Sequence, residues 1–492
     1  MTAVREGKKG KEGKELRPGI PSLHTTHGSL ADSGAGVAEH LYPLAPTRSS
    51  VVAFQALNPG SLSMTADDKC AYARGFPVHV GVDTAKRVHV LVARGPDGRR
   101  QRAYRVPVSR SGFIATDSYL TRLFPEVPRE HMLVGIELAA HYGYTFAHFL
   151  AQQGYRVVNV LAAHTKRTKE LEDNSPLKTD AKDAALICKL VGDGTFVGFP
   201  FLVPRYVELR VLVAYRHRLT VEATRFKNRL QALLDLAWPE FLTLFSSIRK
   251  ETPRAILERW PLPEDLLAAS RRTVSSYVRK VSRGKVTGDR VTALYRAAQN
   301  TIALPHATAA RRMEIQDLLA RWAMVRHRMA TVDAQLEDIL HSLPAGRALL
   351  TVPEVNAVCA ATILSELGTP EDFEHPRQIL KLAGMNLVER SSGRSHGRKK
   401  QSKRGRPMLR RQLFLLGGRW CLRRGLYRAD YEALLARNGG LRTKAVCAVA
   451  RKLVPLLFAI IKHGEPFDIE RWKAARHHSR SDHHLAEPLR GR

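Results

Sequence analysis

Hydrophobic residues follow two different spacings along the chain, and the change between them comes near Thr179. Before it, short apolar runs typical of buried strands alternate with helical patterns at residues 111–123 and 144–153. Strands are predicted over residues 78–83, 88–93, 101–108, 132–137 and 155–161. A short hairpin turn separates the first two strands. The ordered part of the chain is therefore predicted to begin as an α/β unit.

From Thr179 onward, apolar residues recur at helical spacing. Residues 204–236 and 315–343 predict two long helices, which we expect to pair as a helical hairpin or coiled coil. Basic residues spread round the first helix fit either a solvated face or a contact to nucleic acid, and the charge of the chain favours the contact. Between the two helices, residues 248–309 are more polar and less regular, which indicates a small helical insertion.

A last, mainly helical unit is predicted to follow. It opens with Leu-Thr-Val-Pro-Glu-Val-Asn at residues 350–356, and an apolar helix continues to Leu364, a pattern typical of a helix-hairpin-helix element. Such hairpins usually contain glycines, which let backbone N–H groups approach phosphate. Glu354 and Asn356 stand at those positions here. The usual reason for such a turn to bind phosphate is therefore missing.

Composition changes at both ends of the chain. The first 75 residues are rich in Gly, Ser, Thr, Pro and Lys without sustained periodicity, so we expect them to be disordered. The expected division is a disordered extension at 1–75, an α/β domain at 76–200, a helical or coiled-coil region at 204–345 with the insertion 248–309, a C-terminal domain at 346–467 and a basic tail at 468–492.

The chain is strongly basic. Its 79 Lys and Arg outnumber 46 Asp and Glu and give a formal net charge of +33, which favours a polyanionic partner such as DNA or RNA. No apolar run approaches the ~20 residues that span a bilayer, so no membrane partner is expected. The five cysteines are scattered without metal-binding spacing. We expect an intracellular protein, cytoplasmic and associated with the nucleoid.

Four acidic residues are the candidate metal ligands. Asp83 and Glu137 each end a predicted strand, and Asp180 and Asp183 lie three residues apart on one face of a predicted helix. Together they could hold two Mg²⁺ ions about 3.5–4 Å apart, an arrangement that stabilises both the attacking and the leaving oxygen at phosphorus. Taken singly, each has a simpler interpretation: an Asp after a strand is often a turn residue, and Asp180 could cap its helix.

These acids lie in motifs that resemble a known family. The motifs are Gly81-Val82-Asp83-Thr84-Ala85-Lys86, Gly135-Ile136-Glu137 with Tyr144, and Lys178-Thr179-Asp180 followed by Asp183-Ala184. They resemble the DEDD motif of the RuvC-like domain in the IS-one-ten family of insertion-sequence transposases. The resemblance extends over residues 77–240 and 345–467. It implies a ribonuclease-H-like (RuvC-like) N-terminal domain, a coiled-coil region and a C-terminal transposase domain, with Mg²⁺ held by the four acids.

The second half of the chain also resembles this family. Residues 383–393 end in Ser391-Ser392-Gly393 and lead into residues 394–411, which contain nine Lys or Arg and no acid. From the residues alone, such a turn is most often a loop that contacts phosphates. The resemblance instead implies a serine nucleophile and a covalent phosphoserine intermediate. We assign this role to Ser392, with Ser402 second and Ser391 third. Eight residues are expected to bind backbone phosphate: Arg394, Arg398, Lys399, Lys400, Lys403, Arg404, Arg410 and Arg411.

The resemblance also implies a function and partners. It describes a DNA transposase or recombinase that excises and inserts its own mobile element, acting on donor and target DNA as a dimer or tetramer. A structured noncoding RNA encoded in the element, the bridge RNA, would select both DNAs. Two alternatives remain open: a metal-dependent junction resolvase or nuclease in which the serine is incidental, and a non-catalytic nucleic-acid-binding protein.

Overall fold

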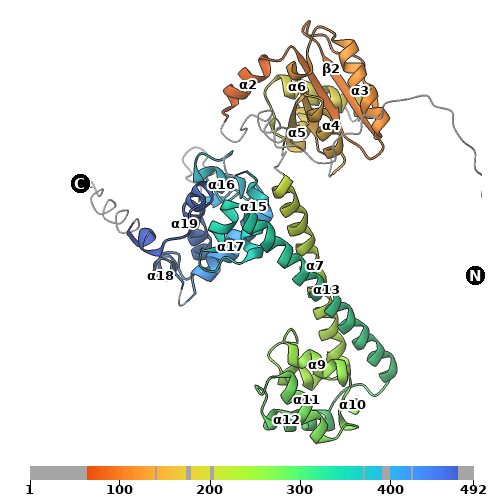
Figure 1. The fold of residues 1–492 in the computed structure, drawn as a ribbon, viewed down its shortest axis with the longest axis vertical. Helices are drawn as coiled ribbons and strands as arrows, with labels where there is room; N and C mark the ends of the chain where they lie inside the picture. Colours follow the sequence, from red (N-terminus) through yellow and green to blue (C-terminus); the bar gives the residue numbers. More distant parts are fainter. Residues whose placement is uncertain are drawn as a thin grey trace, which may run out of the picture. The chain divides into compact units, whose positions relative to one another are not determined.

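A computed structural model of the chain describes residues 64–138, 141–172, 179–199, 204–369, 372–389, 399–422 and 425–474. Its first part is the expected α/β unit, built on a six-stranded mixed sheet (Figure 1). The strands are β1 Val78–Asp83, β2 Val88–Arg94, β3 Tyr104–Pro107, β4 Met132–Glu137, β5 Arg156–Val160 and β6 Val197–Gly198. Their order is β3-β2-β1-β4-β5-β6. This mixed architecture is consistent with the expected ribonuclease-H-like domain.

The two central strands are parallel. β1 pairs with β4 in parallel and with β2 in antiparallel orientation, and β4 continues in parallel to β5. Five of the six residues of β1 and of β4 are buried, because helices cover both faces of the sheet. The helices of this unit are α2 Ala66–Arg74, α3 Arg110–Leu123, the short 3-10 helix Arg129–His131, α4 Tyr144–Gln152, α5 Ala162–Glu172 and α6 Asp180–Gly192.

Helix α2 corrects the prediction of a disordered stretch up to residue 75. It begins with a capping box, in which the backbone N–H of Asp68 donates to Oγ1 of Thr65 at 3.2 Å and the backbone N–H of Thr65 donates to Oδ2 of Asp68 at 2.8 Å. Its polar sequence buries only Ala73, so no hydrophobic periodicity marks it. Lys69 holds it to the sheet unit by donating to the carbonyl of Phe196 at 3.0 Å. Residues 1–63 lie outside the described part.

The rest of the described chain is almost entirely helical. The helices are α7 Pro204–Ala237, α8 Pro239–Leu244, α9 Glu251–Arg259, α10 Pro263–Leu267, α11 Arg271–Val281, α12 Gly288–Gln299, α13 Thr308–Ser342, α14 Pro344–Leu350, α15 Ala357–Leu367, α16 Pro376–Leu382, α17 Pro407–Trp420, α18 Arg428–Arg437 and α19 Arg442–His463. Strands β7 Leu387–Val388 and β8 Lys400–Gln401 pair in antiparallel orientation as a small hairpin. Among the described helices, none combines the length and apolar composition needed to cross a bilayer.

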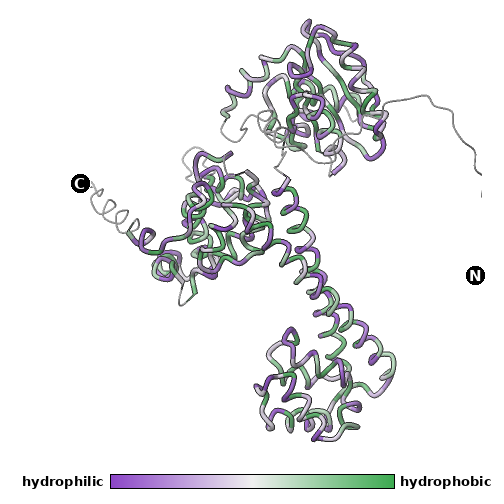
Figure 2. The backbone as a smooth tube through the Cα atoms, in the orientation of Figure 1, coloured by the Kyte–Doolittle hydropathy of each residue, from purple (hydrophilic) through white to green (hydrophobic). Residues whose placement is uncertain are grey.

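The long helices α7 and α13 pack against each other, as the hydrophobic spacing predicts. Figure 2 shows hydrophobic and hydrophilic residues alternating along both, which is the pattern of helices buried on one side only. Between them, Arg216 forms a two-bond ion pair with Asp333, from Nε to Oδ1 at 2.6 Å and from Nη2 to Oδ2 at 3.0 Å. Helices α9 to α12 lie within residues 248–309, where the sequence analysis expected a helical insertion, and α8 precedes them.

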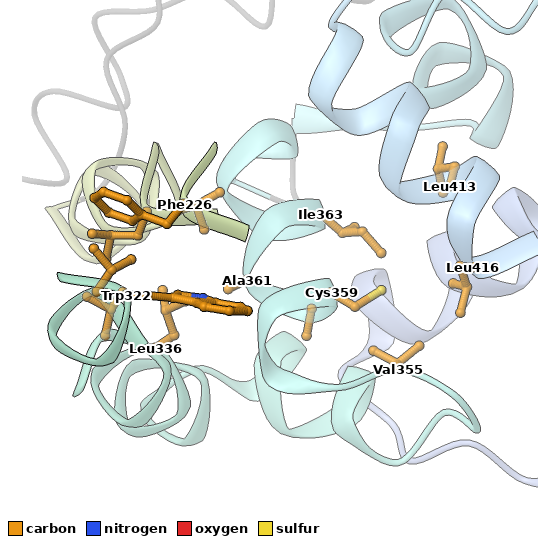
Figure 3. Close-up of a cluster of buried hydrophobic side chains, with 14 of the residues drawn as sticks. Phe226, Trp322, Leu336, Val355, Cys359, Ala361, Ile363, Leu413 and Leu416 are labelled. Carbon is orange, nitrogen blue, oxygen red and sulfur yellow. The ribbon is translucent and has the colours of Figure 1, made fainter. Parts of the chain in front are cut away.

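One hydrophobic core joins this helical pair to the C-terminal helices. Figure 3 shows Phe226 of α7 and Trp322 of α13 on one side of α15, with Leu413 and Leu416 of α17 on the other. These side chains belong to a single cluster of buried residues. The core therefore continues across residue 345, where we predicted a domain boundary, and that boundary stays a prediction.

The turn before α15, where the sequence analysis expected a helix-hairpin-helix element, holds a non-glycine residue in a left-handed conformation. Glu354 has a φ of 65°, in the left-handed region that glycine normally occupies. Asn356 caps α15 by accepting a hydrogen bond from the backbone N–H of Cys359 at 2.9 Å. Trp420 donates from Nε1 to the carbonyl of Pro353 at 2.8 Å and holds the turn from outside. A helix cap and a bond from a buried tryptophan therefore hold this turn in place.

Candidate active site

Two glycines in neighbouring strands let helix α6 lie directly on the sheet. Gly81 of β1 and Gly135 of β4 are partners in the parallel register. A Cβ atom at Gly81 would lie 2.1 Å from the backbone nitrogen of Cys188, and one at Gly135 would lie 2.0 Å from Cγ2 of Val191. No residue with a side chain fits at these distances. The two glycines therefore fix how closely α6 approaches the central strands.

The direction of α6 brings its first turn to the carboxyl ends of these strands. The backbone carbonyl of Ala184 contacts Gly81, and the thiol of Cys188, one turn further, donates to the carbonyl of His79 at 3.3 Å. The helix thus runs opposite to β1. Thr179 caps its start by accepting from the backbone N–H of Lys182 at 3.3 Å. The first helical turn, which begins at Asp180, is therefore directed toward the strand ends.

Two of the predicted acids end the central strands, and the other two lie in the first turn of α6. Asp83 and Glu137 are the last residues of β1 and β4, are register partners and are partly buried. Asp183, in the first turn of α6, is only 7% exposed. Asp180 lies in the same turn and is exposed. Strand ends and a seated helix hold side chains firmly, which is what a catalytic group needs.

Helix α5 contacts two of these acids with residues that the sequence analysis did not single out. Oγ1 of Thr165 donates to Oε2 of Glu137 at 2.6 Å, and Lys169 forms an ion pair with Asp183. Thr165 and Lys169 are four residues apart, so they lie on one face of the helix. The hydroxyl of Thr84 also donates to the backbone carbonyl of Glu137, at 2.7 Å. These contacts fix the orientation of both carboxylates.

The structure does not gather the acids into a ready-made metal site. In the part of the chain that it describes, no three His, Cys, Asp or Glu side chains lie close enough together to hold a metal ion. Asp183 instead has Lys169 as its cationic partner. The convergence of Asp83, Glu137, Asp180 and Asp183 on two ions therefore stays a prediction.

A second pair of glycines shapes the C-terminal basic segment. Gly384 and Gly405 have φ values of 64° and 151°. A Cβ atom at Gly405 would lie 2.4 Å from the carbonyl oxygen of Leu382, and one at Gly384 would lie 2.8 Å from that of Arg404. The backbone N–H of Lys403 donates to the carbonyl of Gly384 at 3.0 Å. Backbone therefore packs directly on backbone, and the β7–β8 hairpin begins and ends at this contact.

Ser402 lies next to this contact, partly buried, and is tied to Asn386. Its backbone N–H donates to the carbonyl of Asn386 at 2.9 Å, and its Oγ donates to Oδ1 of the same residue at 2.6 Å. An amide oxygen is too weak a base to take a proton from serine. The described surroundings of Ser402 therefore position the hydroxyl without activating it. Ser391 and Ser392 lie outside the described residues.

Most of the predicted phosphate-binding residues that the structure describes are exposed. These are Lys399, Lys400, Lys403, Arg404 and Arg411. Arg410 differs, because its Nη1 donates to the carbonyls of Ala383 at 2.9 Å and Lys403 at 3.3 Å and so supports the hairpin. Arg394 and Arg398 lie outside the described residues. The described part of the segment thus presents an exposed cluster of cations beside Ser402.

Comparison with known proteins identifies the family. A DEDD transposase model of IS110 elements matches residues 80–239, which contain all four acids, and a model described as the transposase IS116/IS110/IS902 family matches residues 346–432. The chain belongs to this family of transposases. The transposase therefore acts on DNA, which it cuts and recombines when an insertion sequence moves.

Curated relatives agree with this assignment. The transposase is 26% identical over 393 residues to the 43.6 kDa protein of insertion element IS110 from Streptomyces coelicolor, a match that covers 79% of this chain and 94% of the relative. It is 25% identical over 393 residues to the 44.8 kDa protein of insertion element IS116 from Streptomyces clavuligerus, covering 78% and 94% of the two chains.

Proposed function

We propose that the transposase exchanges DNA strands through a serine nucleophile, with divalent metal held by Asp83, Glu137, Asp180 and Asp183. The observation that carries this proposal is the placement of Asp83 and Glu137 at paired strand ends, with the first turn of α6 directed toward them. The DEDD family match supports metal use at these residues.

The residues present fit Mg²⁺. All four candidate ligands are carboxylates, and hard oxygen donors of this kind suit Mg²⁺ rather than the softer transition metals. A carboxylate as buried as Asp183 also needs a positive charge beside it, and Lys169 provides one in this structure. Bound Mg²⁺ would stabilise negative charge at the reacting phosphorus. Thr165 and Thr84 would keep Glu137 in its orientation during the reaction.

The proposed nucleophile is Ser392. Its Oγ loses a proton and bonds to phosphorus, the bond from phosphorus to the leaving deoxyribose oxygen breaks, and that oxygen takes up a proton. A free hydroxyl of the other DNA then attacks the phosphoserine, which rejoins the strand and restores the serine. Cations of the basic segment balance the phosphate charge while this happens. Ser402 is the second choice, because its hydroxyl is held by Asn386 rather than by a base.

Guidance by a bridge RNA and action as a dimer or tetramer are further parts of the proposal. Both rest on the resemblance of the motifs to the IS-one-ten family. The exposed cations Lys399, Lys400, Lys403, Arg404 and Arg411 are chemically suited to the backbone of either nucleic acid. In this division of labour, base pairing selects the sequence and the protein binds the backbone.

The decisive experiment looks for a covalent protein–DNA adduct. Purified transposase, Mg²⁺, the noncoding RNA of the element and end-labelled donor and target DNA are incubated and separated on a denaturing gel. We expect an adduct with wild type and with Ser402→Ala, and none with Ser392→Ala or Asp83→Ala. Asp67→Ala is the matched control, because Asp67 is an exposed acid on α2 outside the site.

The same gel tests the alternative of a metal-dependent nuclease. That alternative uses the same four acids to activate water and needs no serine. Cleaved ends without an adduct, surviving in Ser392→Ala but not in Asp83→Ala, would establish the nuclease and contradict the serine mechanism. An adduct lost in Ser402→Ala but kept in Ser392→Ala would move the nucleophile to Ser402.

A further inference from the structure

The helical insertion carries a concentrated positive charge to which the sequence analysis gave no role. Residues 270–299, which form α11, α12 and the turn between them, contain eight Lys or Arg and one acid, Asp289. The eight are Arg271, Arg272, Arg279, Lys280, Arg283, Lys285, Arg290 and Arg296. All eight side chains are exposed. Like charges at this density repel one another unless an anion balances them.

Helix α11 presents Arg272 and Arg279 on the side opposite to its buried side. Val274 and Val278 are buried, and the hydroxyl of Tyr277 donates to a backbone carbonyl of α9 at 3.2 Å. At 3.6 residues per turn, Arg272 and Arg279 point away from this buried face. The helix cannot rotate to hide them without losing its core contacts. The cations are therefore held outward by packing, in the group of helices α9 to α12 (Figure 1).

Five exposed cations on α11 and in the turn that follows it are grouped here as the α11 face: Arg272, Arg279, Lys280, Arg283 and Lys285. Within the described residues, none of them has an ion-pair partner. By contrast, Arg312 near the start of α13 contacts two acids of the insertion, Oε1 of Glu264 at 2.5 Å and Oδ1 of Asp265 at 2.9 Å. The α11 face thus keeps its whole charge available for an external anion.

We propose that the α11 face binds the phosphate backbone of duplex DNA. Family membership makes DNA the substrate of this protein, and the inference rests on that membership rather than on the proposed serine chemistry. The other exposed residues of α11 include Ser275 and Ser276, whose hydroxyls can donate to phosphate oxygens. The helix contains no Asn, Gln, Asp or Glu, the side chains that read adenine and cytosine, and no fully exposed aromatic ring on which single-stranded bases could stack.

The test removes three charges of the α11 face in the full-length transposase. The variant Arg272→Ala/Arg279→Ala/Lys280→Ala keeps the helix, because alanine is the strongest helix former. Binding to a labelled random-sequence DNA duplex is measured by fluorescence anisotropy in EDTA over a series of salt concentrations. The slope of log K against log salt is negative, and each lost phosphate contact makes it shallower by about 0.9, so its magnitude is expected to fall by about 2–3. Without metal or cleavage, the result does not depend on the catalytic proposal.

A control variant removes the same net charge elsewhere. Arg205, Arg471 and Lys473 are each paired with a glutamate, at 3.2, 2.8 and 2.7 Å, so their charges are already balanced. Their triple alanine variant should change the salt slope by less than about 1. An equal loss in both variants, or an unchanged slope in the α11 variant, would overturn the proposal. A parallel measurement on duplex RNA completes the test, because a loss confined to RNA would assign the face to RNA and overturn its assignment to DNA.

Discussion

The acid-bearing strand ends and the basic hairpin each depend on a pair of glycines, but for different reasons. Gly81 and Gly135 have ordinary backbone angles and are needed only for space, because α6 lies where their side chains would be. Gly384 and Gly405 are needed for space and also for their positive φ values. The acids are therefore positioned by the packing of regular elements, and the hairpin by the conformation of individual residues. Packing of regular elements leaves a stronger trace in a sequence.

The largest effect is expected at the first pair. In Gly81→Ala the new Cβ meets backbone atoms of α6, which cannot move aside as a side chain can. We expect a loss of about 3 kcal/mol or more in the free energy of unfolding. Urea unfolding measures this loss, and hydrogen exchange of the backbone amides of α6 shows whether the helix has moved away from the sheet. Wild-type exchange in α6 together with wild-type stability would show that the close approach is not required.

A smaller effect is expected at the second pair. Gly384→Ala combines a left-handed φ with contacts of 2.8–2.9 Å to residues 403 and 404, and should cost about 2 kcal/mol. Gly284, between α11 and α12, isolates the first factor, because it has a φ of 76° and a Cβ added there would meet no atom within 4 Å. Gly284→Ala should cost about 1 kcal/mol. If urea unfolding gave the same loss of stability for Gly384→Ala and Gly284→Ala, the close contacts at Gly384 would contribute nothing to the cost of the substitution.

A third test concerns Asp117, an acid of the α/β unit that is positioned by hydrogen bonds from other side chains and not by the close packing of a helix on the sheet. Asp117 accepts hydrogen bonds from Arg129 at 2.8 and 2.9 Å and from Tyr155 at 2.8 Å. Burial alone would raise the pKa of Asp117, but these bonds outweigh it and lower the pKa. Asp117→Asn should therefore cost about 1.5 kcal/mol at neutral pH.

The pH dependence of that cost follows from the sign of the shift. A carboxyl group whose pKa is lower in the folded state than in the unfolded state stabilises the fold at pH values above its unfolded pKa, about 3.9. This contribution is lost as the pH falls through the pKa of the folded state. The difference in unfolding midpoint between wild type and Asp117→Asn should thus be constant from pH 7 to about 5 and shrink below pH 4. A difference that grows on acidification would contradict this assignment.

The smallest effect is expected at a glycine that has neither a positive φ nor a close neighbour for an added Cβ atom. Gly288 begins α12 with no positive φ and no atom within 4 Å of where a Cβ would lie. Gly288→Ala should leave the free energy of unfolding within about 0.5 kcal/mol of wild type, on the stabilising side, because alanine restricts the unfolded chain. A cost as large as that of Gly284→Ala would show that open space and ordinary backbone angles do not make a glycine replaceable.

Much of the sheet could be predicted because its central strands are buried on both faces. The bounds predicted for β1 and β4 agree with the structure, since an unbroken apolar run leaves little choice. Helix α2 was missed because its capping box and polar contacts carry no hydrophobic period. The β7–β8 hairpin was missed because two-residue strands in a loop rich in Gly and Lys have no pattern to detect.

The candidate site was predictable only in part. Strand-final acids and an i, i+3 pair are visible in a sequence, so Asp83, Glu137, Asp180 and Asp183 could be named from it, and their role as metal ligands stays a prediction. The contacts that Thr165 and Lys169 make with two of these acids could not be predicted, because both residues lie on a polar helix whose position beside the strand ends depends on the tertiary fold. Ser392 was assigned by resemblance, and its surroundings lie outside the described residues.

The insertion leaves and re-enters the long helical pair at one point. The backbone N–H of Leu304 donates to the carbonyl of Leu236 at 3.0 Å, so the 67 residues between them start and finish at neighbouring positions. Chain length between two joined points can change without moving those points. The intervening chain can therefore vary in length at its exposed turns without moving the two points at which it joins the long helices, whereas its buried side chains, such as Trp238 and Ile256, are tied to the shared core.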